Sequence, residues 1–128
     1  MKSTKTVLVV DDQPMVLELL DLALQTMSQP PQVIRAQSTK EALAILDTQA
    51  IDLITTDIKR PTGNGLEFLQ KLQERKNSPP AFVITASDDP AIRQVALMLG
   101  AKAYFYKPFI VKEFVNAVST QLEAKCPA

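Results

Sequence analysis

Five residues with oxygen or ammonium groups stand at the ends of short apolar runs in the sequence. They are Asp11, Asp12, Asp57, Thr85 and Lys107. Each one alone has an ordinary explanation, such as a helix cap, a turn residue, a strand end or a solvated charge. Together, three clustered carboxylates repel one another and cost stability unless a cation neutralises them. Lys107 supplies one positive charge, and the remainder indicates Mg²⁺, which takes carboxylate oxygens and keeps water ligands for a phosphate.

The elements that must position these residues alternate strictly between short apolar runs and helical periods. The apolar runs predict strands over residues 6–10, 32–37, 52–56, 81–85 and 103–106. Helical spacing predicts helices over about 14–27, 39–50, 66–75, 90–99 and 111–122.

Prolines, glycines and hydroxyl residues mark the predicted boundaries. Pro14 suits the first position of a helix, where a missing N–H costs nothing. Either Ser38 or Thr39 caps the second helix, and Gly100 ends the fourth. The stretch after Asp57 is predicted to be a loop, because it contains Pro61, Gly63 and Gly65.

Five strand–helix units predict an α/β protein, with one parallel sheet covered by helices on both faces. A length of 128 residues and 46% hydrophobic residues are sufficient for one domain over residues 1–128, with its core at about 6–122 and a tail at 123–128. Ligands of such sheets bind at the carboxyl ends of the strands. The five polar residues are therefore predicted to meet at one edge.

The composition argues against several classes of function. Lys plus Arg equals Asp plus Glu at 14 each, so no net charge draws the chain to nucleic acid or an anionic membrane. The first apolar run, Val7 to Val10, is too short for a signal peptide or a membrane span. The one cysteine, Cys126, fits a reducing cytoplasm. The chain contains no histidine, which removes histidine metal sites, histidine bases and any phosphohistidine of its own.

The order of these motifs resembles the receiver domain of two-component response regulators over about residues 6–122. The matching pieces are Val9-Val10-Asp11-Asp12, Asp57 with Pro61 and Gly65, Thr85-Ala86, Gly100-Ala101, and Tyr104 before Lys107-Pro108-Phe109. The resemblance implies a flavodoxin-like (βα)5 fold with the strand order 2-1-3-4-5.

The resemblance also implies a phosphoryl-transfer site. Asp57 would be the phosphoacceptor, a carboxylate nucleophile that forms an acyl phosphate. Lys107 and Thr85 would each contact a phosphoryl oxygen, so that positioning and charge carry the reaction. Tyr104 would be the switch residue, which turns inward as Thr85 moves toward the phosphate.

The implied cofactor is Mg²⁺, with Mn²⁺ as an alternative. Asp12, Asp57 and the backbone carbonyl of Lys59 would bind the metal directly, and Asp11 would act mostly through a bound water. The side chains of Lys59 and Ser87 would tune hydrolysis of the phosphorylated form.

The function implied by the resemblance is that of a cytoplasmic switch. It accepts a phosphoryl group from a histidine kinase or a histidine phosphotransfer protein. Its output leaves through a protein contact on the face formed by the fourth helix, fifth strand and fifth helix, with no direct contact to nucleic acid or membrane. The chain would be no enzyme, since it catalyses only its own aspartyl phosphorylation and dephosphorylation.

Three alternatives fit the residues less well. A haloacid-dehalogenase-type phosphatase needs an aspartate two residues after the nucleophile, where this chain has Lys59. A flavodoxin needs a hydroxyl- and glycine-rich phosphate loop after the first strand, where Asp11 and Asp12 would repel a phosphate. A degenerate receiver that serves as a phosphorylation-independent docking module usually lacks one of the acidic residues or the lysine, and all of them are present here.

The sequence departs from many receivers in two places. Lys59-Arg60 and Thr62-Gly63-Asn64 flank Pro61 where apolar residues are common, so the phosphorylation lifetime and the choice of partner are expected to differ on this side. Thr55-Thr56 also makes the third strand more polar than usual.

Overall fold

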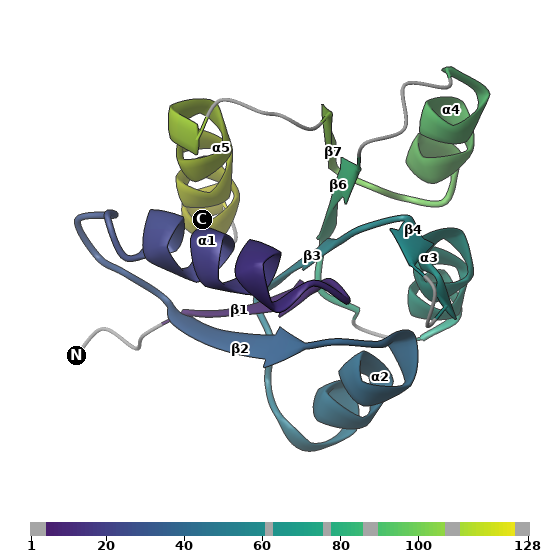
Figure 1. The fold of residues 1–128 in the computed structure, drawn as a ribbon, viewed down its shortest axis with the longest axis horizontal. Helices are drawn as coiled ribbons and strands as arrows, with labels where there is room; N and C mark the ends of the chain where they lie inside the picture. Colours follow the sequence, from purple (N-terminus) through teal and green to yellow (C-terminus); the bar gives the residue numbers. More distant parts are fainter. Residues whose placement is uncertain (1–4, 61–62, 76–77, 86–89, 107–110, 125–128) are drawn as a thin grey trace.

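A five-stranded parallel sheet forms the centre of the computed structural model, which describes residues 5–60, 63–75, 78–85, 90–106 and 111–124 (Figure 1). Its strands are β1 (Thr6–Val10), β2 (Gln32–Ala36), β3 (Leu53–Thr56), β6 (Ala81–Thr85) and β7 (Ala103–Tyr106). They lie in the order β2-β1-β3-β6-β7. Since β6 and β7 are the fourth and fifth strands of this sheet, the predicted order 2-1-3-4-5 is confirmed.

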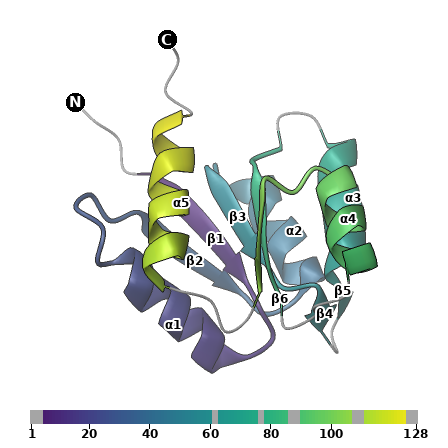
Figure 2. The same ribbon diagram turned by 90° about the horizontal axis from the view of Figure 1, so that it is seen from above.

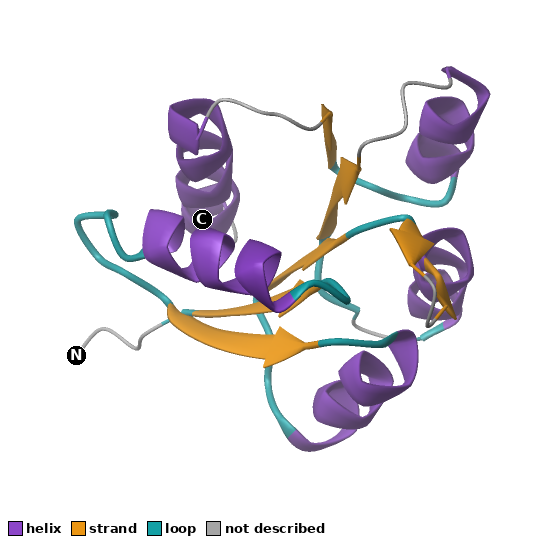
Figure 3. Ribbon diagram, in the orientation of Figure 1, coloured by secondary structure: helices purple, strands orange, loops and turns teal. Residues whose placement is uncertain are grey.

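The helices cover both faces of the sheet, as predicted. They are α1 (Pro14–Leu24), α2 (Thr39–Thr48), α3 (Gly65–Glu74), α4 (Pro90–Met98) and α5 (Val111–Ala124). Helices α1 and α5 lie on one face, while α2, α3 and α4 lie on the other (Figures 1 and 3). In the described part of the chain, no helix is long and apolar enough to cross a bilayer.

Each face of the sheet has its own hydrophobic core, because successive strand residues point to opposite faces. On the α1–α5 side, the buried residues from the sheet are Val7, Val9, Leu53, Phe82 and Ile84. On this side, Phe105 of β7 packs between β6 and α5. The centroid of its ring lies 5.8 Å from that of Phe82 on β6 and 5.5 Å from that of Phe114 on α5. On the other side, the sheet buries Leu8, Val10, Ile54 and Val83 against α2, α3 and α4.

The structure resolves the helix boundaries that the sequence left open. Ser38, not Thr39, caps α2, since its Oγ accepts a 3.1 Å hydrogen bond from the backbone N–H of Glu41. The Glu41 carboxylate returns a bond by accepting from the N–H of Gln37. Gly100 follows α4 with a φ of 101°, a conformation that favours glycine at a helix end.

The largest differences from the prediction are at the end of α1 and after Asp57, while the bounds of the other helices and strands shift by at most two residues. Helix α1 ends at Leu24, so Met27 lies beyond it, although Met27 still packs against the α1–α5 core. The predicted loop after Asp57 contains a short antiparallel pair, β4 (Lys59–Arg60) and β5 (Gly63–Asn64). Lys59 pairs with Asn64 and Arg60 pairs with Gly63, so backbone pairing occupies part of the stretch that was predicted as a loop.

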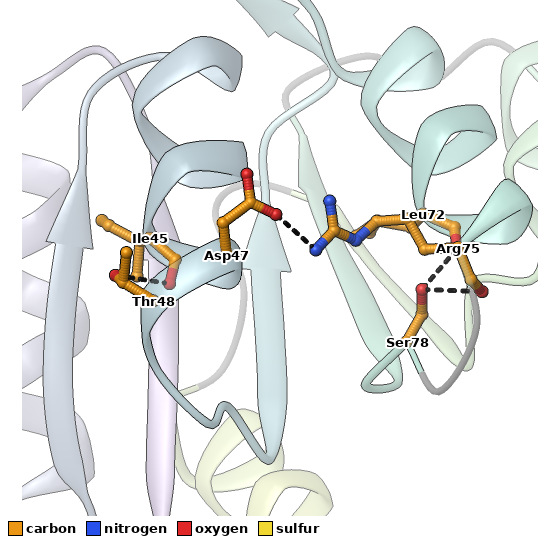
Figure 4. Close-up of polar contacts among 6 residues, drawn as sticks. All are labelled: Ile45, Asp47, Thr48, Leu72, Arg75 and Ser78. Atoms are coloured by element: carbon orange, nitrogen blue, oxygen red, sulfur yellow. Dashed lines mark hydrogen bonds and ion pairs between the residues drawn. The ribbon is translucent and has the colours of Figure 1, made fainter.

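Helices α2 and α3 are joined at their ends by an ion pair (Figure 4). The guanidinium of Arg75, just after α3, lies 2.8 Å from the carboxylate of Asp47 in α2. The Oγ of Ser78 donates to the carbonyls of Leu72 and Arg75, which closes the end of α3. Exposed pairs of this kind contribute at most about 1 kcal/mol, so packing of the two cores holds the fold.

Candidate functional site

Asp11 and Asp57 lie at the carboxyl ends of two neighbouring strands. The backbone N–H of Asp11 donates to the carbonyl of Ala36 at 3.0 Å, which continues the pairing of β1 with β2. The N–H of Asp57 donates to the carbonyl of Val10 at 3.3 Å, which continues the pairing of β3 with β1. The two acidic residues are therefore positioned by the sheet itself and not by loops. The β4–β5 pair lies at the same edge of the molecule (Figure 2).

Burial of these two side chains is unusual for aspartate. Asp11 is 2% exposed and Asp57 is 8% exposed, while Asp12 is only partly buried. The Oδ1 of Asp11 accepts a 3.0 Å hydrogen bond from the N–H of Gln13. The N-cap residue of α1 is Gln13, whose side chain makes no capping hydrogen bond. Neither Asp11 nor Asp12 is therefore the N-cap of this helix. Buried carboxylates beside one another need a compensating positive charge.

The donor set at this edge fits a hard divalent cation. Carboxylate and carbonyl oxygens are the ligands that Mg²⁺ prefers, and one or two protein carboxylates are enough for it. Asp11, Asp12 and Asp57 supply such oxygens, and the backbone of Lys59 follows two residues after Asp57. Within the described ranges, no group of three or more His, Cys, Asp or Glu side chains is close enough to enclose a metal by itself. Among these residues, Asp11, Asp12 and Asp57 therefore do not form a preformed three-carboxylate cluster.

Thr85 and Tyr104 point to the same face of the sheet. The register pairs Val83 with Tyr104 and Thr85 with Tyr106, so Thr85 lies two residues beyond the strand position opposite Tyr104. Thr85 is fully buried, while Tyr104 is partly buried and packs against the core on the α2–α4 side. A change at Thr85 could therefore reach Tyr104 across two adjacent strands on a single face.

Several predicted site residues lie outside the described part of the chain. Lys107 and Ser87 are among them, and the side chain of Lys59 is also not described, although its backbone is part of β4. The structure thus brings Asp11, Asp57 and Thr85 to one edge, as predicted, and leaves the lysine and the hydrolysis-tuning residues as predictions.

Comparison with known proteins identifies the family of the chain. The family model described as the response regulator receiver domain matches residues 7–119. The chain belongs to this family. Mg²⁺ and phosphoaspartate are typical of its members, which act in two-component signal transduction.

Relatives of this receiver domain are longer proteins. Response regulator protein PilR of Pseudomonas aeruginosa is 35% identical over 127 residues, which cover 98% of this chain and 28% of PilR. The alkaline phosphatase synthesis transcriptional regulatory protein PhoP of Bacillus subtilis is 33% identical over 97% of this chain and 52% of its own length. The receiver domain therefore spans about half, or less, of these two curated relatives.

Solved structures agree on the fold. A CheY-like response regulator receiver domain protein from Methanospirillum hungatei superposes with a TM-score of 0.87 at 25% identity, covering 96% of this chain and 97% of that one. A putative response regulator from Chloroflexus aurantiacus reaches a TM-score of 0.86 at 28% identity, over 94% of this chain and 99% of that one.

Two contacts of this receiver domain had no signal in the sequence. The Oγ1 of Thr56 donates a 2.9 Å hydrogen bond to the carbonyl of Asp57, which holds the backbone at the acidic edge. The guanidinium carbon of Arg93 lies 5.8 Å from the centroid of the Tyr104 ring. The second contact depends on how closely α4 packs against β7, which helical periodicity does not determine.

Proposed function

We propose that this receiver domain accepts a phosphoryl group on Asp57. The observation that supports it best is the position of this carboxylate. Asp57 continues β3 at the carboxyl edge of the sheet, is hydrogen-bonded through its backbone to Val10, and so lies beside the buried Asp11. A turn residue with no chemical role would have little reason to be 8% exposed beside another carboxylate.

The proposed reaction is a nucleophilic substitution at phosphorus. An oxygen of the Asp57 carboxylate forms a new P–O bond, while the P–N bond of a phosphohistidine donor breaks. The electron pair of that bond stays on the imidazole of the donor, which can then take a proton. With acetyl phosphate as the donor, the leaving group is acetate. A bound Mg²⁺ would supply charge stabilisation for the phosphoryl oxygens.

The other residues of the proposed site would position the cation and the phosphoryl group. Asp11, Asp12, Asp57 and the Lys59 carbonyl would hold the cation. Thr85 and Lys107 would each contact a phosphoryl oxygen, which suits a reaction that depends on positioning and charge. Ser87 and the Lys59 side chain would tune the rate at which the phosphoryl group is lost.

The signal would leave through a protein contact. Phosphorylation would shift a two-state equilibrium in which Thr85 and Tyr104 change together. Because both lie on the face beside α4, the partner surface is proposed to be α4, β7 and α5.

The proposed domain spans residues 1–128 and acts in the cytoplasm. It would receive its phosphoryl group from a histidine kinase or histidine phosphotransfer protein, and it would turn over no external substrate. The competing candidate, a phosphorylation-independent docking module, gains no support from a site with all its acidic residues in place.

The deciding experiment is phosphorylation of the purified chain by acetyl phosphate, followed by intact mass spectrometry. We expect one acid-stable, base-labile phosphoryl group per chain, formed with Mg²⁺ and lost when EDTA is present. Asp12→Ala should remove most of the Mg²⁺ dependence. A chain that stays unmodified across a range of Mg²⁺ concentrations would support the docking module instead.

A further inference from the structure

Arg93 lies over the ring of Tyr104, and this contact joins α4 to β7. The distance from the guanidinium carbon to the ring centroid is 5.8 Å, within the range of a cation–π interaction. Arg93 is itself exposed, whereas Tyr104 is partly buried. An exposed cation thus covers one side of an aromatic ring that is half removed from solvent.

Among the residues that the structure describes, no ion pair accounts for the position of Arg93. The salt bridges found among the described residues join Arg35 to Asp21 and Arg75 to Asp47. Arg93 takes part in neither of them, so the interaction found for its guanidinium is the one with the ring. A planar guanidinium stacks on an aromatic face better than an ammonium does.

Tyr104 is therefore held from two directions. It packs against the core on the α2–α4 side, which includes the buried Val83 and Ala96. Arg93 lies over the ring from α4, three residues after the start of that helix at Pro90. To leave this orientation for solvent, the ring must give up both the core contact and the cation.

We propose that Arg93 is a positioning residue for Tyr104, which holds the ring in its half-buried orientation against α4. This inference rests on the proposed function for its consequence, since Tyr104 is proposed to lie inward when Asp57 is phosphorylated. The half-buried orientation is proposed to be the inward one, so Arg93, by stabilising it before phosphorylation, lowers the cost of reaching the phosphorylated state. The basal equilibrium of the switch is then set partly by a residue outside the phosphorylation site.

The expected size of the effect follows from the strength of the contact. A cation–π interaction at an exposed site changes a two-state equilibrium roughly two- to five-fold. Arg93→Ala should therefore lower the ratio of inward to outward Tyr104 by that factor. Arg93→Lys keeps a cation with poorer stacking and should restore part of it. Gln94→Ala, a neighbouring exposed residue of the same helix, is the matched control and should behave as the wild type.

The first test measures Tyr104 directly, without any phosphoryl group. NMR gives the side-chain rotamer populations of Tyr104 and the contacts of its ring protons with α4 in each variant. We expect fewer ring contacts with α4 in Arg93→Ala alone. Unchanged Tyr104 populations in that variant would overturn the inference, whatever the state of Asp57.

The second test measures the coupling to the site with beryllofluoride, a phosphoryl mimic, and Mg²⁺. We expect a roughly two- to five-fold weaker apparent affinity for Arg93→Ala. The effect of Arg93→Ala should vanish in a Tyr104→Leu background, because leucine removes the aromatic ring on which the effect depends. The wild type, the two single variants and the double variant together form a double-mutant cycle. An equal loss in both backgrounds would contradict a role through Tyr104. If beryllofluoride binds no variant, including the wild type, the proposed function fails while the first test still decides the role of Arg93.

Discussion

The backbone N–H of Asp57 donates its hydrogen bond to the carbonyl of Val10, one residue before Asp11. The sheet therefore holds two acidic residues on neighbouring strands, and rotation of the side chains alone cannot carry them far apart. In the absence of a cation, such an arrangement costs stability. The site resembles other functional centres in which a stability cost is tolerated for chemistry.

Neutralising one of these carboxylates should make the metal-free chain more stable. Asp11→Asn removes the negative charge and keeps an Oδ1 that can accept the hydrogen bond from the N–H of Gln13. We expect the free energy of unfolding in urea with EDTA to rise by about 1 kcal/mol.

Added Mg²⁺ gives the matching control. A cation that binds only the folded state stabilises the wild type by mass action, and Asp11→Asn should lose much of that gain. If Asp11→Asn were less stable than the wild type in EDTA and still gained as much from Mg²⁺, the carboxylates would not form a shared cation site.

The two threonines of β3 should respond oppositely to replacement by valine. Thr55 is fully buried, and the described part of the chain offers its hydroxyl no hydrogen-bond partner. Burying an unpaired hydroxyl costs about 1–3 kcal/mol, so Thr55→Val should raise the free energy of unfolding by about 1 kcal/mol.

Thr56→Val is the matched control for that change. The hydroxyl of Thr56 donates to the carbonyl of Asp57, so its removal should destabilise the chain by about 1 kcal/mol. Chemical denaturation of both variants in parallel provides the measurement. A destabilised Thr55→Val would mean that its hydroxyl is satisfied after all.

The fold could be predicted from the sequence because each level of pattern agreed. Apolar runs placed β1, β6 and β7 at their observed bounds, since a short apolar run is the usual pattern of a parallel strand covered by helices. The polar character of Thr55-Thr56 could be recognised in the sequence. The sequence did not show that the hydroxyl of Thr56 donates a hydrogen bond, while the hydroxyl of Thr55 has no partner in the described part of the chain. That difference depends on which face each residue takes and on what lies within reach there.

The candidate site was predictable only in part, for a physical reason. The ends of parallel strands meet at one edge, so Asp11, Asp57 and Thr85 could be placed together from the strand assignment alone. The Arg93–Tyr104 contact depends on the separation of α4 and β7, which many side chains determine together. The β4–β5 pair depends on backbone hydrogen bonds that a reversal permits but does not require.

Removing the hydroxyl of Thr85 should separate phosphorylation from its readout. Thr85→Ala keeps the acidic edge, so we expect it still to accept a phosphoryl group from acetyl phosphate. The response of the Tyr104 ring signals in NMR should be largely lost, because Thr85 and Tyr104 share one face of β6 and β7. Thr85→Ser keeps the hydroxyl and should retain the response. A full Tyr104 response in Thr85→Ala would show that the signal takes another path.

The central claim is that Asp57 carries the phosphoryl group, and locating the modified residue tests it most directly. The chain is treated with acetyl phosphate and Mg²⁺, the acyl phosphate is reduced with borohydride, and the peptides are sequenced by tandem mass spectrometry. The account predicts that the reduced residue is at position 57, and that Asp57→Asn, which keeps the shape of the side chain without the nucleophilic carboxylate, yields no reduced residue. Modification at another aspartate in the wild type, or undiminished labelling of Asp57→Asn, would contradict it.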